Sequence, residues 1–211
     1  NNLKDMLEQS TKLYGDKDAF LVKKAGSENY SPVSYKQFKR DVDALGTAFI
    51  NIGLKGKRIA LIGENRYEWA VSYMAVVNGT GIVVPLDKEL PQNDMDCLAN
   101  QASGNQKEHL SFEGLLKRGY ELLESGDRSF IDAQIDNNEM NMLLFTSGTT
   151  EMSKAVMLSH STICANLMSM CSMLYIGEKD IFLSVLPIHH TYECTCGFLC
   201  PIYRGATIAF F

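Results

Sequence analysis

The chain has 211 residues, of which 45% are hydrophobic and 21% charged, as in an ordinary globular protein with a sizeable core. Its net charge of −5 argues against a nucleic-acid partner, whose phosphates would require a basic face. The sequence contains no apolar run of about 18 residues and no apolar signal-peptide core at its start, so we expect no transmembrane segment. The six cysteines are best explained as free thiols, which favours a cytoplasmic protein.

Helix-period and strand-like segments alternate along the N-terminal half. The clearest helix has an apolar stripe from Tyr35 to Ile52, starts at a capping-box pattern of Ser34 and Gln37, and is followed by Gly53. From this half we expect a helix over 34–52, a strand over 58–62, a helix capped by Asn65 and ending at Gly79, a strand over 82–84 stopped by Pro85, and a further helix after Pro91.

The C-terminal half repeats this alternation after a less regular stretch over 103–140. Strands that alternate with crossover helices predict an α/β fold with a mostly parallel sheet flanked by helices. The apolar run at the end indicates that the chain is part of a longer domain. We expect helices over 112–123, from Ser161 to about Tyr175 and around 191–203, and strands over 142–145, 155–158, 181–186 and 206–211.

The segment from Leu144 to His160 is the most informative for function. A buried strand is predicted to run into a loop with four hydroxyl residues, Gly148 and Lys154, and a second strand follows at once. Hydroxyls and exposed backbone N–H groups donate to phosphate oxygens, a glycine allows close approach, and a lysine supplies a positive charge. This pattern is suited to gripping a polyphosphate.

A polar hairpin turn with a solvated lysine is the competing interpretation, and composition alone favours it because Ser, Thr and Gly are common in loops. The segment also differs from the usual mononucleotide P-loop. Gly148 is not followed by a second Gly with Lys and Ser or Thr, and a strand rather than a helix is predicted next.

The segment resembles the phosphate-loop signature of the adenylate-forming (AMP-binding) superfamily. Phe145 to Thr150, Lys154, Val156 and the triplet Leu158 to His160 match that signature in order and spacing. Three further stretches are similar to family segments, the last in the form found among long-chain fatty acyl-CoA synthetases: Val33–Phe38, Val84–Asp87 and Leu186–Glu193.

The resemblance implies that the chain, residues 1–211, is the N-terminal part of an AMP-binding domain with its phosphate loop at 145–155 and without the C-terminal domain. It implies ATP-dependent activation of a long-chain fatty acid to an acyl-adenylate, followed by thioester formation with coenzyme A. The implied substrates and cofactors are the fatty acid, ATP, Mg²⁺ and coenzyme A, and peripheral contact with a membrane stays open. An adenylase that loads an acyl carrier protein is the alternative within the family.

The resemblance also assigns site residues. His190 matches the family histidine beside the acyl carboxylate and is the expected catalytic residue, and His189 matches its aromatic neighbour. Tyr192 and Phe198 are candidates for the acyl tunnel, with core packing as the competing interpretation. Thr149 or Thr150 is expected near Mg²⁺. The residues expected to hold the β- and γ-phosphates are Thr146, Ser147, Gly148, Thr149, Thr150 and Lys154.

Three positions depart from the family pattern, since Glu151, Ser153 and Ala155 stand where Gly, Pro and Gly are usual. A carboxylate that pointed into a phosphate loop would repel the ligand, so we expect Glu151 to face water. The family's downstream catalytic motifs have no counterpart before Phe211, and we therefore expect the isolated chain to be inactive.

Two other hypotheses remain open. His189, His190, Cys194, Cys196 and Cys200 lie close together in sequence, but their spacing is not a usual zinc spacing, so buried free thiols are favoured over a metal site. The other hypothesis is a non-catalytic nucleotide-binding module.

Overall fold

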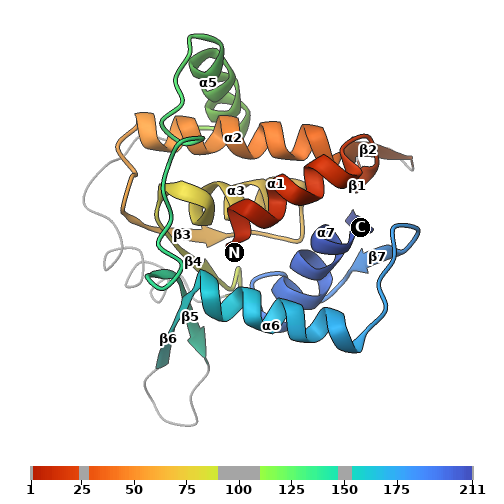
Figure 1. Cartoon of the computed structure of the whole chain (residues 1–211). Coiled ribbons are helices and arrows are strands. Elements are labelled where there is room, and N and C mark those ends of the chain that lie inside the picture. The colour runs from red at the N-terminus through yellow and green to blue at the C-terminus, as the bar shows by residue number, and fades with distance from the viewer. Residues whose placement is uncertain (1, 24–28, 90–109, 147–153, 211) are drawn as a thin grey trace.

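The computed structural model describes residues 2–23, 29–89, 110–146 and 154–210 (Figure 1). The N-terminal part comprises α1 (Leu3–Tyr14), β1 (Asp18–Lys23), β2 (Tyr30–Ser34), α2 (Tyr35–Asn51), β3 (Arg58–Ile62), α3 (Tyr67–Ala75), the π-helical turn η1 (Val76–Thr80) and β4 (Ile82–Leu86). The C-terminal part comprises α5 (Phe112–Glu124), β5 (Met140–Thr146), β6 (Lys154–Ser159), α6 (His160–Met173), β7 (Ile181–Ser184), the π-helical segment η2 (Glu193–Leu199), α7 (Cys200–Arg204) and β8 (Thr207–Phe210).

The strands form two sheets, in the orders β2-β1-β8-β7 and β3-β4-β5-β6. Each sheet has two parallel pairs of strands and one antiparallel pair at its edge, β1 with β2 in the first sheet and β5 with β6 in the second. The helices α2 and α5 lie along one side of the molecule and α6 along the opposite side (Figure 1). The predicted fold class, a mostly parallel α/β fold flanked by helices, is confirmed, although the strands divide between two sheets.

The α2 helix forms as its sequence predicts. The Ser34 hydroxyl accepts the Gln37 amide at 3.1 Å, which satisfies a free N–H group in the first turn. Gly53 follows the helix with φ of +85°, a left-handed conformation that a side chain would disfavour. On the same helix, buried Asp41 accepts hydrogen bonds from the Tyr67 hydroxyl at 2.6 Å and from Tyr120, so one carboxylate joins α2, α3 and α5.

Two local predictions are wrong. Asn65 does not cap α3, because the N-cap position belongs to Arg66 and the Asn65 side chain turns to the other sheet. Pro85 does not stop β4, which continues to Leu86 in parallel register with β3. A proline lacks the N–H group that a central strand needs, but β5 pairs with β4 only at Val83, so Pro85 leaves no bond to β5 unmade.

The other element predictions agree within a few residues, except that β7 ends at Ser184 rather than continuing to residue 186. The helix expected around 191–203 is realised as η2 followed directly by α7. The helix expected after Pro91 lies outside the described residues. No helix in the described ranges combines the length and apolar character needed to cross a membrane.

An aromatic core joins the two halves of the chain. Phe20 on β1 packs edge-on against Phe38 of α2, with ring centroids 4.8 Å apart, and against Tyr67 of α3 at 5.3 Å. Phe198 of η2, 1% exposed, packs against Phe20 and also against Trp69 and Tyr73. Aromatic rings favour this edge-to-face geometry, which stabilises the pairs beyond the burial of their surface. The core therefore fixes α3, and with it the loop after β3, against the segment that follows β7.

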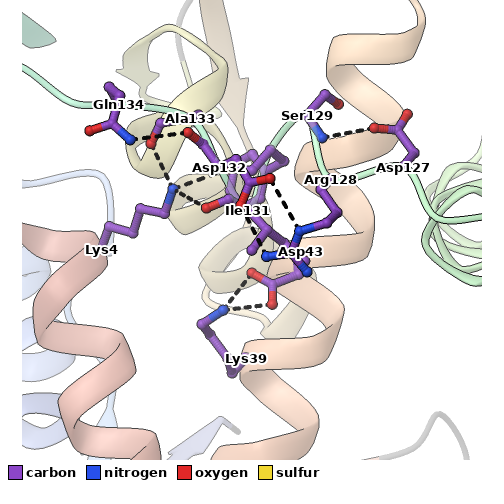
Figure 2. Close-up of polar contacts among 11 residues, drawn as sticks. Lys4, Lys39, Asp43, Asp127, Arg128, Ser129, Ile131, Asp132, Ala133 and Gln134 are labelled. Carbon is purple, nitrogen blue, oxygen red and sulfur yellow. Dashed lines mark hydrogen bonds and ion pairs between the residues drawn. The ribbon is translucent and has the colours of Figure 1, made fainter.

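The helix α1 is held from its first turn (Figure 2). The Lys4 ammonium donates to three backbone carbonyls, those of Phe130 at 3.1 Å and of Ile131 and Ala133 at 2.8 Å. Burial of this group lowers the pKa of Lys4, but the three acceptors compensate the loss of water. The segment that joins α5 to β5 is thus fixed to the start of the chain.

Candidate functional site

A cleft of about 1110 Å³ opens between the two sheets. Most of its lining follows the carboxyl ends of parallel strands: Gly63–Glu68 after β3, Asp87–Glu89 after β4, and Val185, Pro187 and His189 after β7. The strands themselves add Val22 and Lys23 of β1, Leu183 and Ser184 of β7, and Phe210 of β8. Ligands of open α/β sheets bind at this edge. The cleft is therefore the place where the fold itself favours a small-molecule site.

The predicted phosphate segment leads to the same edge. β5 runs parallel to β4, so its end at Thr146 points the same way as the ends of β3 and β4. β6 returns antiparallel, with Phe145 opposite Ala155 and Thr146 opposite Lys154. The strand–loop–strand prediction is confirmed for the backbone of these two strands. Ser147, Gly148, Thr149, Thr150, Glu151 and Ser153 lie outside the described residues, as do the side chains of Thr146 and Lys154.

The two histidines follow β7. His189 is half-buried in the cleft wall, with its Nε2 3.7 Å from the Asp87 carboxylate at the end of β4. Burial lowers the pKa of His189, while Asp87 acts in the opposite direction. His190 is exposed beside it, with ring centroids 5.0 Å apart. The backbone N–H of His190 donates to the Pro187 carbonyl at 3.0 Å, and the backbone carbonyl of His190 accepts a hydrogen bond from the Cys194 N–H at 2.9 Å. The structure thus places the two rings side by side, with His189 in the cleft wall and His190 exposed next to it.

The two tunnel candidates separate in the structure. Phe198 is in the aromatic core, which confirms the core-packing interpretation for that residue. Tyr192 is 66% exposed. Its role in binding an acyl chain stays a prediction.

Three polar residues that support the cleft wall, Asn65, Ser184 and Glu193, are not among the site residues that the sequence predicts. Asn65 makes hydrogen bonds to Ser184, Leu186 and Ile188, across from its own sheet to the segment after β7. Buried Ser184 donates in turn to Glu193 Oε1 at 2.8 Å. Burial raises the pKa of the Glu193 carboxyl, and the bond from Ser184 offsets part of that effect. Partners so far along the chain leave no local pattern that could have revealed them.

His160, the last residue of the matched phosphate segment, has a different position. It is 1% exposed, its Nδ1 accepts the Leu3 N–H at 3.2 Å, and its Nε2 lies 3.0 Å from the Val77 carbonyl. These partners require a neutral ring with the proton on Nε2, and burial lowers its pKa to about 4. His160 therefore fastens α1 and η1 to α6.

The cysteine-rich segment lies on η2 and α7. The five cysteines of the described residues, Cys164, Cys171, Cys194, Cys196 and Cys200, are free thiols. Burial raises the pKa of Cys194 to about 12, so this thiol stays protonated at neutral pH. Within the described part of the chain no group of three or more His, Cys, Asp or Glu side chains could hold a metal ion.

Three basic side chains line the described cleft, Lys23, Arg66 and Lys88, and the last two are paired with carboxylates. Lys88 is paired with Glu64 at 3.0 Å and Arg66 with Glu68 at 3.4 Å, both on the wall itself. Lys88 also holds the pKa of Glu64 below its usual value. The exposed apolar side chains of Leu183 and Val185 line the cleft as well.

Comparison with solved structures gives the same architecture. The chain superposes over its full length on 45% of apo MatB from Rhodopseudomonas palustris, with a TM-score of 0.78 and 18% identity. It covers 39% of a fatty acyl-adenylate ligase from L. pneumophila in complex with acyl adenylate and pyrophosphate, with a TM-score of 0.79 and 21% identity. At these identities the likeness concerns the fold alone.

Sequence comparison identifies the family. A CoA ligase of Gibberella moniliformis is 27% identical over 78% of this chain and 30% of its own length, and fatty acyl-CoA synthetase A of Dictyostelium discoideum is 26% identical over 87% and 33%. A mitochondrial malonate–CoA ligase of Bos taurus is 24% identical over 92% and 36%. The chain thus spans about a third of the length of these relatives. The profile described as AMP-binding enzyme matches residues 7–103 and 96–211, and the chain belongs to this family.

Proposed function

We propose that the protein of which residues 1–211 form the N-terminal AMP-binding part activates a fatty, long-chain carboxylate with ATP and transfers the acyl group to coenzyme A. The observation that carries the proposal is the position of the matched phosphate segment. The strand that leads into it, β5, runs parallel to β3 and β4, and the residues that follow β3 and β4 line the cleft together with His189. Relatives named as fatty acyl-CoA synthetases support the substrate class, and a relative named as a malonate–CoA ligase makes chain length the point to test.

The chemistry requires two things from the chain. Negative charge builds on the departing pyrophosphate, so Lys154 and the hydroxyls of Thr146, Ser147, Thr149 and Thr150 would stabilise it most. Mg²⁺, if held near Thr149 or Thr150, would neutralise further phosphate charge. The attacking carboxylate must be oriented toward the phosphorus, and His190 would donate its imidazole N–H to a carboxylate oxygen.

The cleft wall favours an apolar acyl group. Leu183 is 56% exposed and Val185 67% exposed, and both line the cleft. Exposed side chains of this kind at a cleft are suited to binding a hydrocarbon chain, since about 25 cal/mol is gained per Å² of apolar surface removed from water. This supports a fatty acid as the substrate class, since the apolar part of malonate is a single methylene and would cover little of this surface.

The test is carboxylate-dependent ATP–pyrophosphate exchange by the intact natural reading frame, with acids from malonate to long-chain fatty acids. Lys154→Ala should reduce exchange strongly, whereas the matched control Lys179→Ala, at an exposed lysine before β7, should not. Exchange that increases with chain length would support the proposal. Exchange with malonate alone would overturn the substrate class, and no exchange with any acid would favour a non-catalytic nucleotide-binding module. Comparing coenzyme A with an acyl carrier protein as acceptor decides the second step.

A further inference from the structure

The side chain of Asn65 crosses from one sheet to the other. It follows β3, in the β3-β4-β5-β6 sheet, and its partners follow or belong to β7 in the other sheet. Its Nδ2 donates to the Ser184 hydroxyl at 2.9 Å and to the Leu186 carbonyl at 2.6 Å. Its Oδ1 accepts the Ile188 N–H at 3.0 Å. Both donors of the amide and its acceptor are used on a single segment.

This set of bonds fixes a short stretch of backbone at two points. The Leu186 carbonyl and the Ile188 N–H are main-chain groups two residues apart, so the amide binds that stretch much as a neighbouring strand would. β7 ends at Ser184, so no strand pairing is assigned to the backbone beyond it. Ser184, fixed by its bond to Glu193, supports the same amide from the buried side.

The stretch held by Asn65 leads directly into the two histidines. Ile188 is 1% exposed and anchors the chain just before His189, and the Pro187 carbonyl accepts the His190 N–H. From the opposite sheet, the Asp87 carboxylate also lies 3.7 Å from His189. The backbone that carries His189 into the cleft wall, with His190 beside it, therefore depends on what Asn65 holds.

We infer that Asn65 is a positioning residue, which sets the place of His189 and His190 for the carboxylate substrate through the backbone segment that its amide binds. The inference rests on the proposed function for its effect on activity. Its structural part, the placement of the two rings, stands independently. A displacement of about 1 Å at a reacting group can lower a rate by orders of magnitude, so the loss of this amide has a measurable consequence.

The experiment compares Asn65→Asp and Asn65→Ala with wild type in the intact natural reading frame. Aspartate keeps the shape and the acceptor for the Ile188 N–H but loses both donated bonds. Asn51→Ala, at an exposed asparagine that ends α2, is the matched control. For both Asn65 variants we expect exchange with kcat/KM for the carboxylate at least about tenfold lower, and KM for ATP within about twofold of wild type.

A readout independent of activity separates this inference from the proposed function. Modification of His189 and His190 by diethyl pyrocarbonate, followed by peptide mass spectrometry, should be faster for half-buried His189 in both Asn65 variants and unchanged in Asn51→Ala. Unchanged labelling of His189 would overturn the inference even in an active enzyme. Equal losses for both substrates would reduce Asn65 to a structural role. Faster labelling with no exchange by wild type would support the positioning while refuting the proposed function.

Discussion

Two histidine regions of the molecule, both within segments that match family motifs, have opposite surroundings. His160 is buried, with hydrogen bonds at both ring nitrogens to backbone groups of α1 and η1. His189 lines the cleft with its Nε2 3.7 Å from the Asp87 carboxylate, and the exposed ring of His190 lies beside it. A match to a family motif therefore does not tell a structural histidine from a candidate site histidine, whereas burial and hydrogen-bond partners do. We expect substitutions to change stability at His160 and activity at His190.

The largest expected effect is on stability at the buried region. His160→Ala leaves the Leu3 N–H and the Val77 carbonyl without partners and opens a cavity, which we expect to cost about 4 kcal/mol. Native-state hydrogen exchange of the amides in α1 and α6 measures this loss in the intact protein. Protection equal to that of wild type would show that His160 is not a structural anchor.

The pH dependence of stability sharpens the same contrast. The neutral form of His160 is favoured by the fold, with its pKa lowered from 6.5 to about 4. Its contribution is thus complete above pH 6.5 and is lost as the pH falls toward 4, by about 3 kcal/mol. His160→Gln, which can keep a donor and an acceptor, should remove this dependence. The measurement is the difference in unfolding free energy between wild type and variant across that range, and a constant difference would contradict the prediction.

At the cleft the expected effect is on activity instead. His190→Ala should lower carboxylate-dependent exchange about 100-fold, equivalent to about 2.7 kcal/mol of transition-state stabilisation. Because His190 is exposed, hydrogen-exchange protection of α1 and α6 should not change. If His190→Ala lowers both activity and the hydrogen-exchange protection of α1 and α6, His190 has a structural role like that of His160.

The smallest effect concerns the titration of His189. The Asp87 carboxylate raises the pKa of this ring against the larger effect of burial, so Asp87→Asn should lower that pKa further. Nuclear magnetic resonance of the imidazole nitrogens detects the change, with His160 as an internal reference that should not shift. A higher pKa of His189 in the variant would mean that Asp87 does not act on it.

Local signals made much of the fold predictable. α2 needs only its apolar stripe, the Ser34 cap and Gly53, all within one segment, and β3 and α5 are similarly local. The local sequence equally favours Asn65 as a helix cap, but its side chain binds residues 119 to 123 positions away. Three hydrogen bonds there stabilise more than one cap bond would. The prediction that Pro85 ends β4 is wrong for the same reason, because β4 can contain a proline at this position only where β5 no longer pairs with it.

The candidate site was predictable where a motif carried it and not where topology did. The phosphate strands and the histidine pair follow from the resemblance. The common direction of β3, β4 and β5 comes from strand pairing that no single segment encodes, and His189 reaches the cleft from β7 in the other sheet. The sequence likewise could not predict that His160 is structural, because its partners Leu3 and Val77 are distant from residue 160 along the chain.

The bonds made by α1 have a consequence for how the chain folds during synthesis. Lys4 binds carbonyls 126 to 129 residues later and Leu3 binds a histidine 157 residues later, so α1 is made long before its partners. Synthesis proceeds at roughly 5–20 residues per second, so the apolar face of α1 stays uncovered for many seconds before its partners are made. Nascent chains arrested before residue 130 should therefore expose α1 to a chaperone or protease, and chains arrested well beyond residue 160 should protect it.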